Sequence, residues 1–324
     1  MERIDTHTHV VPGVWRHFCR EYGFDRPDGM PAIPAWTPEA HIDLMNKLGI
    51  SKSILSITSP GTHLKPDDDV LGRTITRESN DEVARICRLH PNKFAFFASL
   101  PLPDVAGSVE EIDRALDSLG AVGFALMTNA HGYYLGDARL DKVFAKLNER
   151  KAIVFMHPTT CHSQTLPEAE RPLSQYPAPM LEFFFDTTRA VVNLILSGTV
   201  ARYPDITYLV SHCGGALPPL VERFSSFATR ILGGEMAMDS SHVKELFNSR
   251  FYFDLAGFPF PDQIHGLLRM TDASRLLYGS DYPYTPASAL TGMATRMDDE
   301  LKKLFKEGAV REIYSGNAKR LFKI

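Results

Sequence analysis

Short apolar stretches recur along the whole chain, and longer amphipathic stretches separate them. The apolar stretches are rich in Val, Ile, Phe, Tyr and Leu and are nearly continuous in apolar character. Parallel strands that are buried on both faces have this pattern, whereas half-exposed antiparallel strands alternate. The pattern predicts eight strands: Arg3–Val10, Lys52–Thr58, Phe94–Leu100, Ala121–Met127, Ala152–His157, Ile206–His212, Phe251–Leu255 and Arg275–Ser280.

Helical patterns lie between these strands. The first begins with Pro38 at its first helical position and ends at Gly49, as helices often do. The predicted helices are Thr37–Leu48, Asp69–His90, Ser108–Leu119, Asp141–Lys151, Phe184–Tyr203 and Leu217–Leu232, and residues 297–324 form a helical cap at the C-terminus.

Alternating strands and helices predict a parallel sheet, and eight strands are the number that closes a barrel. We therefore expect one domain over residues 1–324, a (β/α)8 TIM-like barrel. A doubly wound open sheet is the alternative, but it would need a glycine-rich phosphate loop after the first strand, where this chain has His-Thr-His-Val-Val-Pro. Val11–Ala35 is rich in Pro, Gly and charged residues, and Thr159–Pro179 is rich in Pro, Ser and Thr; they predict long loops after strands one and five. In such barrels these loops lie at the C-terminal face, where active sites are built.

Composition narrows the class of protein further. The chain has 324 residues, 44% of them hydrophobic, and a net charge of −4, which gives no reason to expect a nucleic-acid or membrane-surface partner. No stretch reaches the roughly 18 uncharged apolar residues that a membrane span requires. The four cysteines form no C-x-x-C pair, so we expect reduced thiols in a cytoplasmic protein.

The segment Asp5-Thr6-His7-Thr8-His9 carries the sharpest chemical pattern. Residues two apart on a strand point to the same side, so His7 and His9 both face the barrel interior. Two imidazoles in one apolar cavity lack hydrogen-bond partners, and a divalent metal ion would satisfy both. The alternative is a pair of core histidines bonded to neighbouring backbone.

Three further polar residues stand just past the ends of predicted strands: His157, His212 and Asp281. One such residue alone would more often cap a loop than bind a ligand. Together with the strand that carries His7 and His9, four strand ends in this chain carry such polar residues. This number indicates that the residues form one site. Histidine and carboxylate together suit Zn²⁺, with Mn²⁺ or Fe²⁺ as further candidates.

The chain resembles the amidohydrolase superfamily, and most closely its decarboxylase branch of aminocarboxymuconate-semialdehyde and salicylate-type enzymes. Within that branch the likeness is greatest to the 6-methylsalicylate decarboxylases. The stretches that carry the resemblance are Asp5–His9, Trp36–Glu39, Thr128–Gly132, Phe185–Arg189, His212–Gly215, Arg223 and Gly279–Pro283.

The resemblance implies that His7, His9, His157 and Asp281 are metal ligands and that His212 lies beside the metal as a proton relay. Binuclear members of the superfamily carry a bridging carboxylated lysine on strand four, and Ala121–Met127 contains none. We therefore expect one ion per chain, with the intact His-x-His pair favouring zinc and manganese as the alternative.

Arg223 follows His212 by eleven residues. In the decarboxylases that this chain resembles, an arginine at this spacing reaches the neighbouring subunit's site, which implies a homodimer or homotetramer. A surface salt bridge is the alternative. We also expect His131 and Trp36 to contact the substrate. The other loop histidines, His63 and His162, are more typical of solvated side chains.

These residues support one leading hypothesis for the function. Asp281 or His212 would protonate the ring of a small phenolic acid such as 6-methylsalicylate, releasing CO2 and leaving 3-methylphenol. Metal-dependent hydrolysis of a small lactone or amide is the second hypothesis. A barrel that binds metal and ligand without turnover is the third.

Overall fold

The fold is described from a computed structural model, which describes residues 1–161, 173, 175–233 and 239–324. One eight-stranded sheet runs through it in the order β1-β2-β3-β4-β7-β8-β9-β10, and the paired neighbours are parallel. The strands are β1 Arg3–His9, β2 Ile50–Ser56, β3 Phe94–Ser99, β4 Gly123–Met127, β7 Ile153–His157, β8 Thr207–Val210, β9 Phe251–Asp254 and β10 Leu276–Leu277. All eight predicted strands are confirmed.

Backbone hydrogen bonds join the last strand to the first and close the barrel. Thr6 N donates to Tyr278 O at 3.0 Å, and Ser280 N donates to His7 O at 3.1 Å. Further along, His9 N donates to Tyr282 O at 2.6 Å. The segment that follows β10 therefore forms the seam with β1, and the prediction of a (β/α)8 barrel is confirmed.

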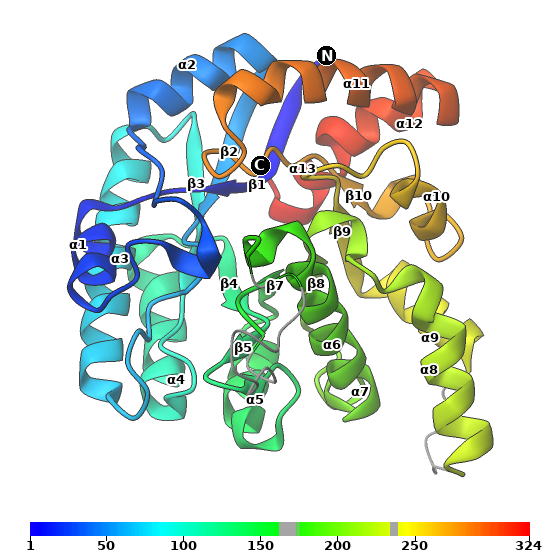
Figure 1. Ribbon diagram of the computed structural model, residues 1–324, viewed down its shortest axis with the longest axis horizontal. Coiled ribbons are helices and arrows are strands. Elements are labelled where there is room, and N and C mark those ends of the chain that lie inside the picture. Colours follow the sequence, from blue (N-terminus) through cyan, green and yellow to red (C-terminus); the bar gives the residue numbers. More distant parts are fainter. Residues whose placement is uncertain (162–172, 174, 234–238) are drawn as a thin grey trace.

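Helices surround the strands, and α8 and α9 extend away from the rest of the molecule (Figure 1). The first predicted helix begins at its expected cap, where Thr37 Oγ1 accepts a hydrogen bond from Ala40 N, and ends at the left-handed Gly49. The helices are α1 Gly13–Glu21, α2 Pro38–Leu48, α3 Asp69–Leu89, α4 Val105–Arg114, α5 Asp141–Glu149, α6 Glu182–Leu196, α7 Thr199–Arg202, α8 Val221–Ser226, α9 Ser240–Ser249, α10 Gln263–Leu267, α11 Ala287–Leu304, α12 Glu307–Arg311 and α13 Asn317–Phe322. Among the described residues no helix is long and apolar enough to cross a membrane.

The segment predicted as a long loop after the first strand contains a helix, α1. It buries Trp15 and Cys19, which lie one turn apart on one face. Its free N-terminal amides are satisfied from outside, because the Glu82 carboxylate of α3 accepts from Gly13 N at 3.0 Å and from Val14 N at 3.1 Å. A cap supplied from a distant helix leaves no local sequence signature, which explains the error.

Three other differences concern boundaries and short elements. Gly198, in a left-handed conformation, divides the predicted helix Phe184–Tyr203 into α6 and α7. A short hairpin of β5 (Asn129–Ala130) and β6 (Tyr133–Tyr134) follows β4 and was not predicted. Most of the predicted loop Thr159–Pro179, with His162, lies outside the described residues.

The barrel interior holds a compact apolar layer. One inward side chain comes from each of seven strands, and α13 covers the layer from below with Ala318 and Phe322. The strand members are Ile4, Ile54, Phe97, Ala125, Phe155, Leu209 and Leu277. The Phe155 ring contacts the His7 ring edge-on at 4.9 Å between centroids, so polar residues begin directly above this layer.

Candidate metal centre

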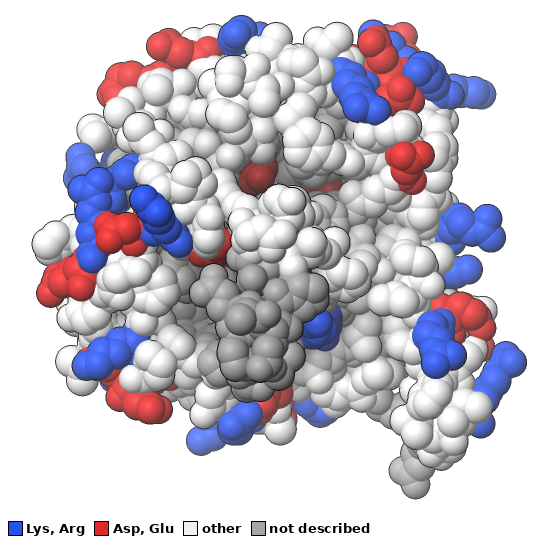
Figure 2. Space-filling view, viewed as in Figure 1, with Lys and Arg blue, Asp and Glu red and all other residues white. Residues whose placement is uncertain are grey.

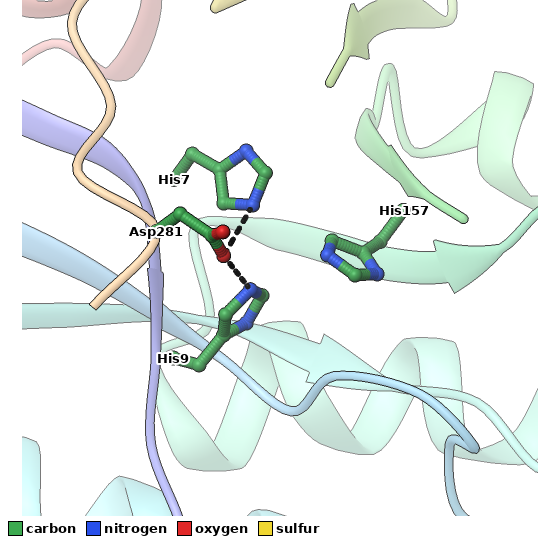
Figure 3. Close-up of side chains that lie close together, drawn as sticks. All are labelled: His7, His9, His157 and Asp281. Atoms are coloured by element: carbon green, nitrogen blue, oxygen red, sulfur yellow. Dashed lines mark ion pairs between the residues drawn. The ribbon is translucent and has the colours of Figure 1, made fainter. Parts of the chain in front are cut away.

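Four side chains from three strand ends converge at the centre of the barrel. His7 and His9 come from β1, His157 ends β7, and Asp281 follows β10 (Figure 3). Their ligand atoms all lie within 4.8 Å of one another. Asp281 Oδ1 is 3.2 Å from His9 Nε2 and 3.5 Å from His7 Nε2. These are the four residues for which the sequence predicted a metal site, and the fold brings all of them together.

The second ring nitrogen of each histidine is held by a neighbouring acceptor. His7 Nδ1 lies 2.9 Å from Asp254 Oδ2, and His157 Nδ1 donates to Pro158 O at 2.8 Å. His9 Nδ1 donates to Ser56 O at 3.3 Å. Acceptors at Nδ1 fix the tautomer, so that each ring can offer the Nε2 lone pair to a metal.

The donor set fits a divalent cation. The Nε2 atoms of His7 and His9 are buried and have no hydrogen-bond partner among the described residues. An unsatisfied buried nitrogen destabilises the fold by about 1–3 kcal/mol. Three imidazole nitrogens and a carboxylate oxygen face one another, and a cation between them satisfies all four, with the ligand types and number found for Zn²⁺.

The charges of the site also favour a cation. Burial lowers the pKa of His9, and burial with the neighbouring histidines holds the pKa of His157 well below its ordinary value, so both rings are neutral ligands. Burial also opposes a charge on His7, but the Asp254 and Asp281 carboxylates outweigh it and raise that pKa to about 10. Burial opposes ionisation of Asp281, yet the neighbouring imidazoles of His212, His7 and His9 hold its pKa well below the usual range. A positive charge is therefore favoured at this point, whether a proton on His7 or a metal ion that displaces it.

Asp254 is a candidate site residue that the sequence analysis missed. Its side chain is fully buried, and while Oδ2 holds His7, Oδ1 accepts from the backbone amides of His212 and Ala256, each at 3.0 Å. The carboxylate therefore ties a metal ligand to the segment that carries His212. A single acid inside the apolar predicted strand Phe251–Leu255 was the pattern that could have revealed it.

His212 lies beside the four ligands. Its Nε2 is 3.9 Å from Asp281 Oδ2, and its ring meets the His7 ring at 4.7 Å between centroids. Gln263 Nε2 donates to its backbone oxygen at 2.8 Å. Of the glycines that follow, Gly215 is required by packing, because a Cβ there would come within 2.6 Å of the Phe184 backbone oxygen.

A cavity of about 430 Å³ on the β2–β4 side of the barrel is lined by residues next to His157 in the chain and in the sheet, although none of the four candidate ligands lines it. Met127, which lines it, is the direct strand partner of His157. His131 also lines the cavity, and its Nε2 lies 3.0 Å from Nδ1 of His63. His63 is buried and bonded to Asp69, which corrects the expectation of a solvated side chain. Figure 2 shows a hollow near the centre of the face with acidic atoms inside it, while most charged side chains lie at the periphery.

The other predicted substrate contacts lie elsewhere. The Trp36 indole donates to His41 Nδ1 at 3.0 Å, and the residue is not among those described as lining the cavity. Arg223 is exposed on α8, and its guanidinium lies over the ring of Phe227, the residue that follows α8. Tyr284 was not predicted: its ring contacts His9 edge-on at 5.6 Å, and its buried hydroxyl has no hydrogen-bond partner among the described residues.

Comparisons with known proteins agree with this geometry. The family model described as "Amidohydrolase" matches residues 4–324. "Decarboxylase yanB" of Aspergillus niger is 33% identical over 326 residues, which cover 96% of this chain and 87% of that protein. The "6-methylsalicylic acid decarboxylase" of Penicillium expansum is 31% identical, over 97% of this chain and 96% of that protein. Among solved structures, one titled "Amidohydrorolase II" has a TM-score of 0.90 at 30% identity, covering 99% of this chain and all of that one.

The chain belongs to the amidohydrolase family. Within that family it is an enzyme of the decarboxylase branch, a carboxy-lyase, as its full-length relatives are.

Proposed function

We propose that this enzyme catalyses the metal-dependent, non-oxidative decarboxylation of a small phenolic acid of the 6-methylsalicylate type, giving 3-methylphenol and CO2. The observation that carries the proposal is the adjacency of two features: a four-ligand cluster with orphaned buried nitrogens, and a cavity of about 430 Å³ beside it. That volume lies within the range of small-molecule sites. The relatives named for 6-methylsalicylic acid support this substrate class.

One divalent ion per chain is part of the proposal, zinc first and manganese second. His7, His9, His157 and Asp281 would hold it, and β4 has no lysine to bridge a second ion. When bound, the ion supplies a positive charge that holds the substrate carboxylate and its ortho oxygen.

The chain's own groups supply the proton. Decarboxylation requires that the ring carbon bearing the carboxylate accept a proton, after which the carbon–carbon bond breaks and its electrons restore the aromatic ring. His212 and Asp281 are the candidate donors, because their polar atoms lie 3.9 Å apart beside the ligand cluster. A donor must stand within hydrogen-bond reach of the reacting carbon, which both could do for a substrate held there. His131 would contact the substrate from the cavity wall, and Trp36 remains a predicted contact.

We also propose that the working unit is a homodimer or homotetramer in which Arg223 serves the partner's site. Arg223 is exposed on an arm that extends from the barrel (Figure 1). The same arm exposes the apolar residues Phe227, Ile231 and Leu232, the last two by 67% and 71%. Exposed apolar side chains gathered on a projection are typical of an interface.

A CO2-release assay over a panel of hydroxybenzoates tests the proposed function. Protein loaded with zinc or with manganese should release CO2 from 2-hydroxy-6-methylbenzoate, and in heavy water the product should carry one deuterium where the carboxylate had been. Consumption of lactones or amides without CO2 would instead favour the hydrolase. Ligand binding with no turnover of either class would favour a non-catalytic barrel.

A further inference from the structure

Asp28 lies in the loop after β1, at a tight turn formed by Pro27, Asp28 and Gly29. Its φ is 57°, in the left-handed region, which aspartate adopts more readily than most residues other than glycine. Thr160 Oγ1 donates to Asp28 Oδ1 at 2.6 Å, which fixes the carboxyl group against the wall of the cavity.

The composition of the cavity lining sets the Asp28 carboxyl group apart from the other lining residues. Asp28 is the one acidic residue among the described lining residues, and they include neither lysine nor arginine. The apolar wall is formed by Phe24, Leu100, Leu102, Ala125, Leu126 and Met127. The aromatic ring of a phenolic acid in this cavity would therefore contact apolar side chains along one edge and the Asp28 carboxyl group at another.

Among the described residues, Thr160 and Ser59 donate hydrogen bonds to the Asp28 carboxyl group. Burial raises its pKa, and the hydroxyls of Thr160 and Ser59 lower it by less. An ionised carboxylate can accept about four hydrogen bonds. Acceptor capacity therefore remains for a donor that arrives with the substrate, and a partly desolvated carboxylate favours such a donor.

The cavity lies next to the segment that carries one of the candidate ligands. Met127 in the cavity wall pairs with His157 on the neighbouring strand, and Thr159 and Thr160 follow His157 in the chain. The ring of Tyr284, which contacts His9, has its pKa raised chiefly by burial and then by neighbours that include the Asp28 and Asp281 carboxylates. A ring whose carboxylate lies at the metal ligands can thus present another edge to Asp28.

We propose that Asp28 determines substrate specificity by accepting a hydrogen bond from a second ring hydroxyl and by rejecting a second ring carboxylate. This inference rests on the proposed function, and within its substrate class it ranks phenolic acids with an additional hydroxyl group above 2-hydroxy-6-methylbenzoate. The Asp28 carboxylate would repel a second carboxylate on the substrate and attract a second hydroxyl. Specificity often requires both a repulsive and an attractive element.

The test compares 2-hydroxy-6-methylbenzoate with counterparts that carry a second hydroxyl at ring carbon 3, 4 or 5. The wild-type enzyme should prefer one of these isomers in kcat/KM by about 10-fold to 100-fold, the range expected for a hydrogen bond to a charged group. In Asp28→Ala that ratio should fall to within about threefold of one. In Asp28→Asn the matching dicarboxylates, which bind the wild type weakly, should inhibit about 10-fold more strongly. Asp25→Asn is the matched control, because Asp25 is exposed in the same loop and should keep the wild-type ratio.

The outcomes separate the two proposals. If no panel member releases CO2 from the metal-loaded wild type, the proposed function fails. If CO2 is released but wild type shows no preference for any dihydroxy isomer, or Asp28→Ala keeps the wild-type ratio, the role of Asp28 is wrong. Should both Asp28 variants fail to fold, product inhibition of the wild type decides: dihydroxytoluenes must inhibit about 10-fold more strongly than 3-methylphenol, and equal inhibition overturns the proposal.

Discussion

Asp254→Asn should weaken metal binding without unfolding the barrel. The asparagine keeps one oxygen, which can still accept from the amides of His212 and Ala256. Its amide NH2 group must then face His7 Nδ1, where the carboxylate oxygen stood at 2.9 Å. Two donors cannot face each other, so His7 must move its proton to Nε2 and lose the lone pair aimed at the metal.

The expected decrease in metal affinity follows from the loss of a properly oriented histidine ligand. Removing such a partner of a metal-binding histidine typically weakens metal affinity by about 10-fold to 100-fold. That corresponds to about 1.4–2.8 kcal/mol of binding free energy. Competition against a chelator of known affinity measures the dissociation constant, and elemental analysis measures the metal retained after dialysis.

Ser56→Ala provides the matched control for this experiment. It removes one of two contacts to His9 Nδ1 and leaves the Ser56 backbone oxygen as acceptor, so metal affinity should change by less than about threefold. Circular dichroism and thermal unfolding establish that both variants are folded. A folded Asp254→Asn protein with wild-type metal affinity would refute the assignment of Asp254 as the group that orients His7.

Four further predictions concern the site and its surroundings. His7→Ala or Asp281→Ala should abolish retention of metal by elemental analysis and turnover by CO2 release; two tightly held ions per wild-type chain would contradict the single site. His212→Asn should lower kcat by about 10²-fold with metal content intact, and a wild-type rate would exclude it as proton donor. Inactive Arg223→Ala and Asp281→Ala chains should regain partial activity when mixed and reassembled; no rescue, together with a fully active monomer, would remove the role in trans. Gly72→Ala places a Cβ within 2.3 Å of a buried histidine ring, so denaturant unfolding should show a loss of about 1–3 kcal/mol, and unchanged stability would contradict this packing.

Much of the ligand set could be predicted from sequence because barrel geometry makes it local. Each ligand follows or ends an apolar strand, and in a parallel barrel all strand ends of one sense meet at one mouth. His7 and His9 share a face through their spacing alone. The ends of β7 and β10 then supply His157 and Asp281. Predicting the strands was enough to predict that these side chains meet, and the family resemblance separated His212 from the four expected ligands.

The partners of these ligands were harder to foresee, because they depend on contacts across the fold. Asp254 interrupts an apolar strand, but its contact with His7 is predictable only when β9 is placed near β1, with β10 between them. His63 looked like a solvated loop residue, but Gly72 leaves room for its ring against α3. The α1 helix depends on Glu82, a residue in another helix. Each of these relations joins positions far apart in the chain, where periodicity and spacing give no information.

The seam that closes the barrel determines when, during synthesis of the protein, the metal site can form. His7 and His9 stand on one side of the seam between β1 and β10, and Asp281 stands on the other. During synthesis the two histidines emerge with β1, before the other seven strands of the barrel, and the carboxylate emerges only after β10. An ion held by these four side chains would join β1 to the segment that follows β10. Its retention therefore reports that the last strand has docked, and by mass action it stabilises only the completed barrel.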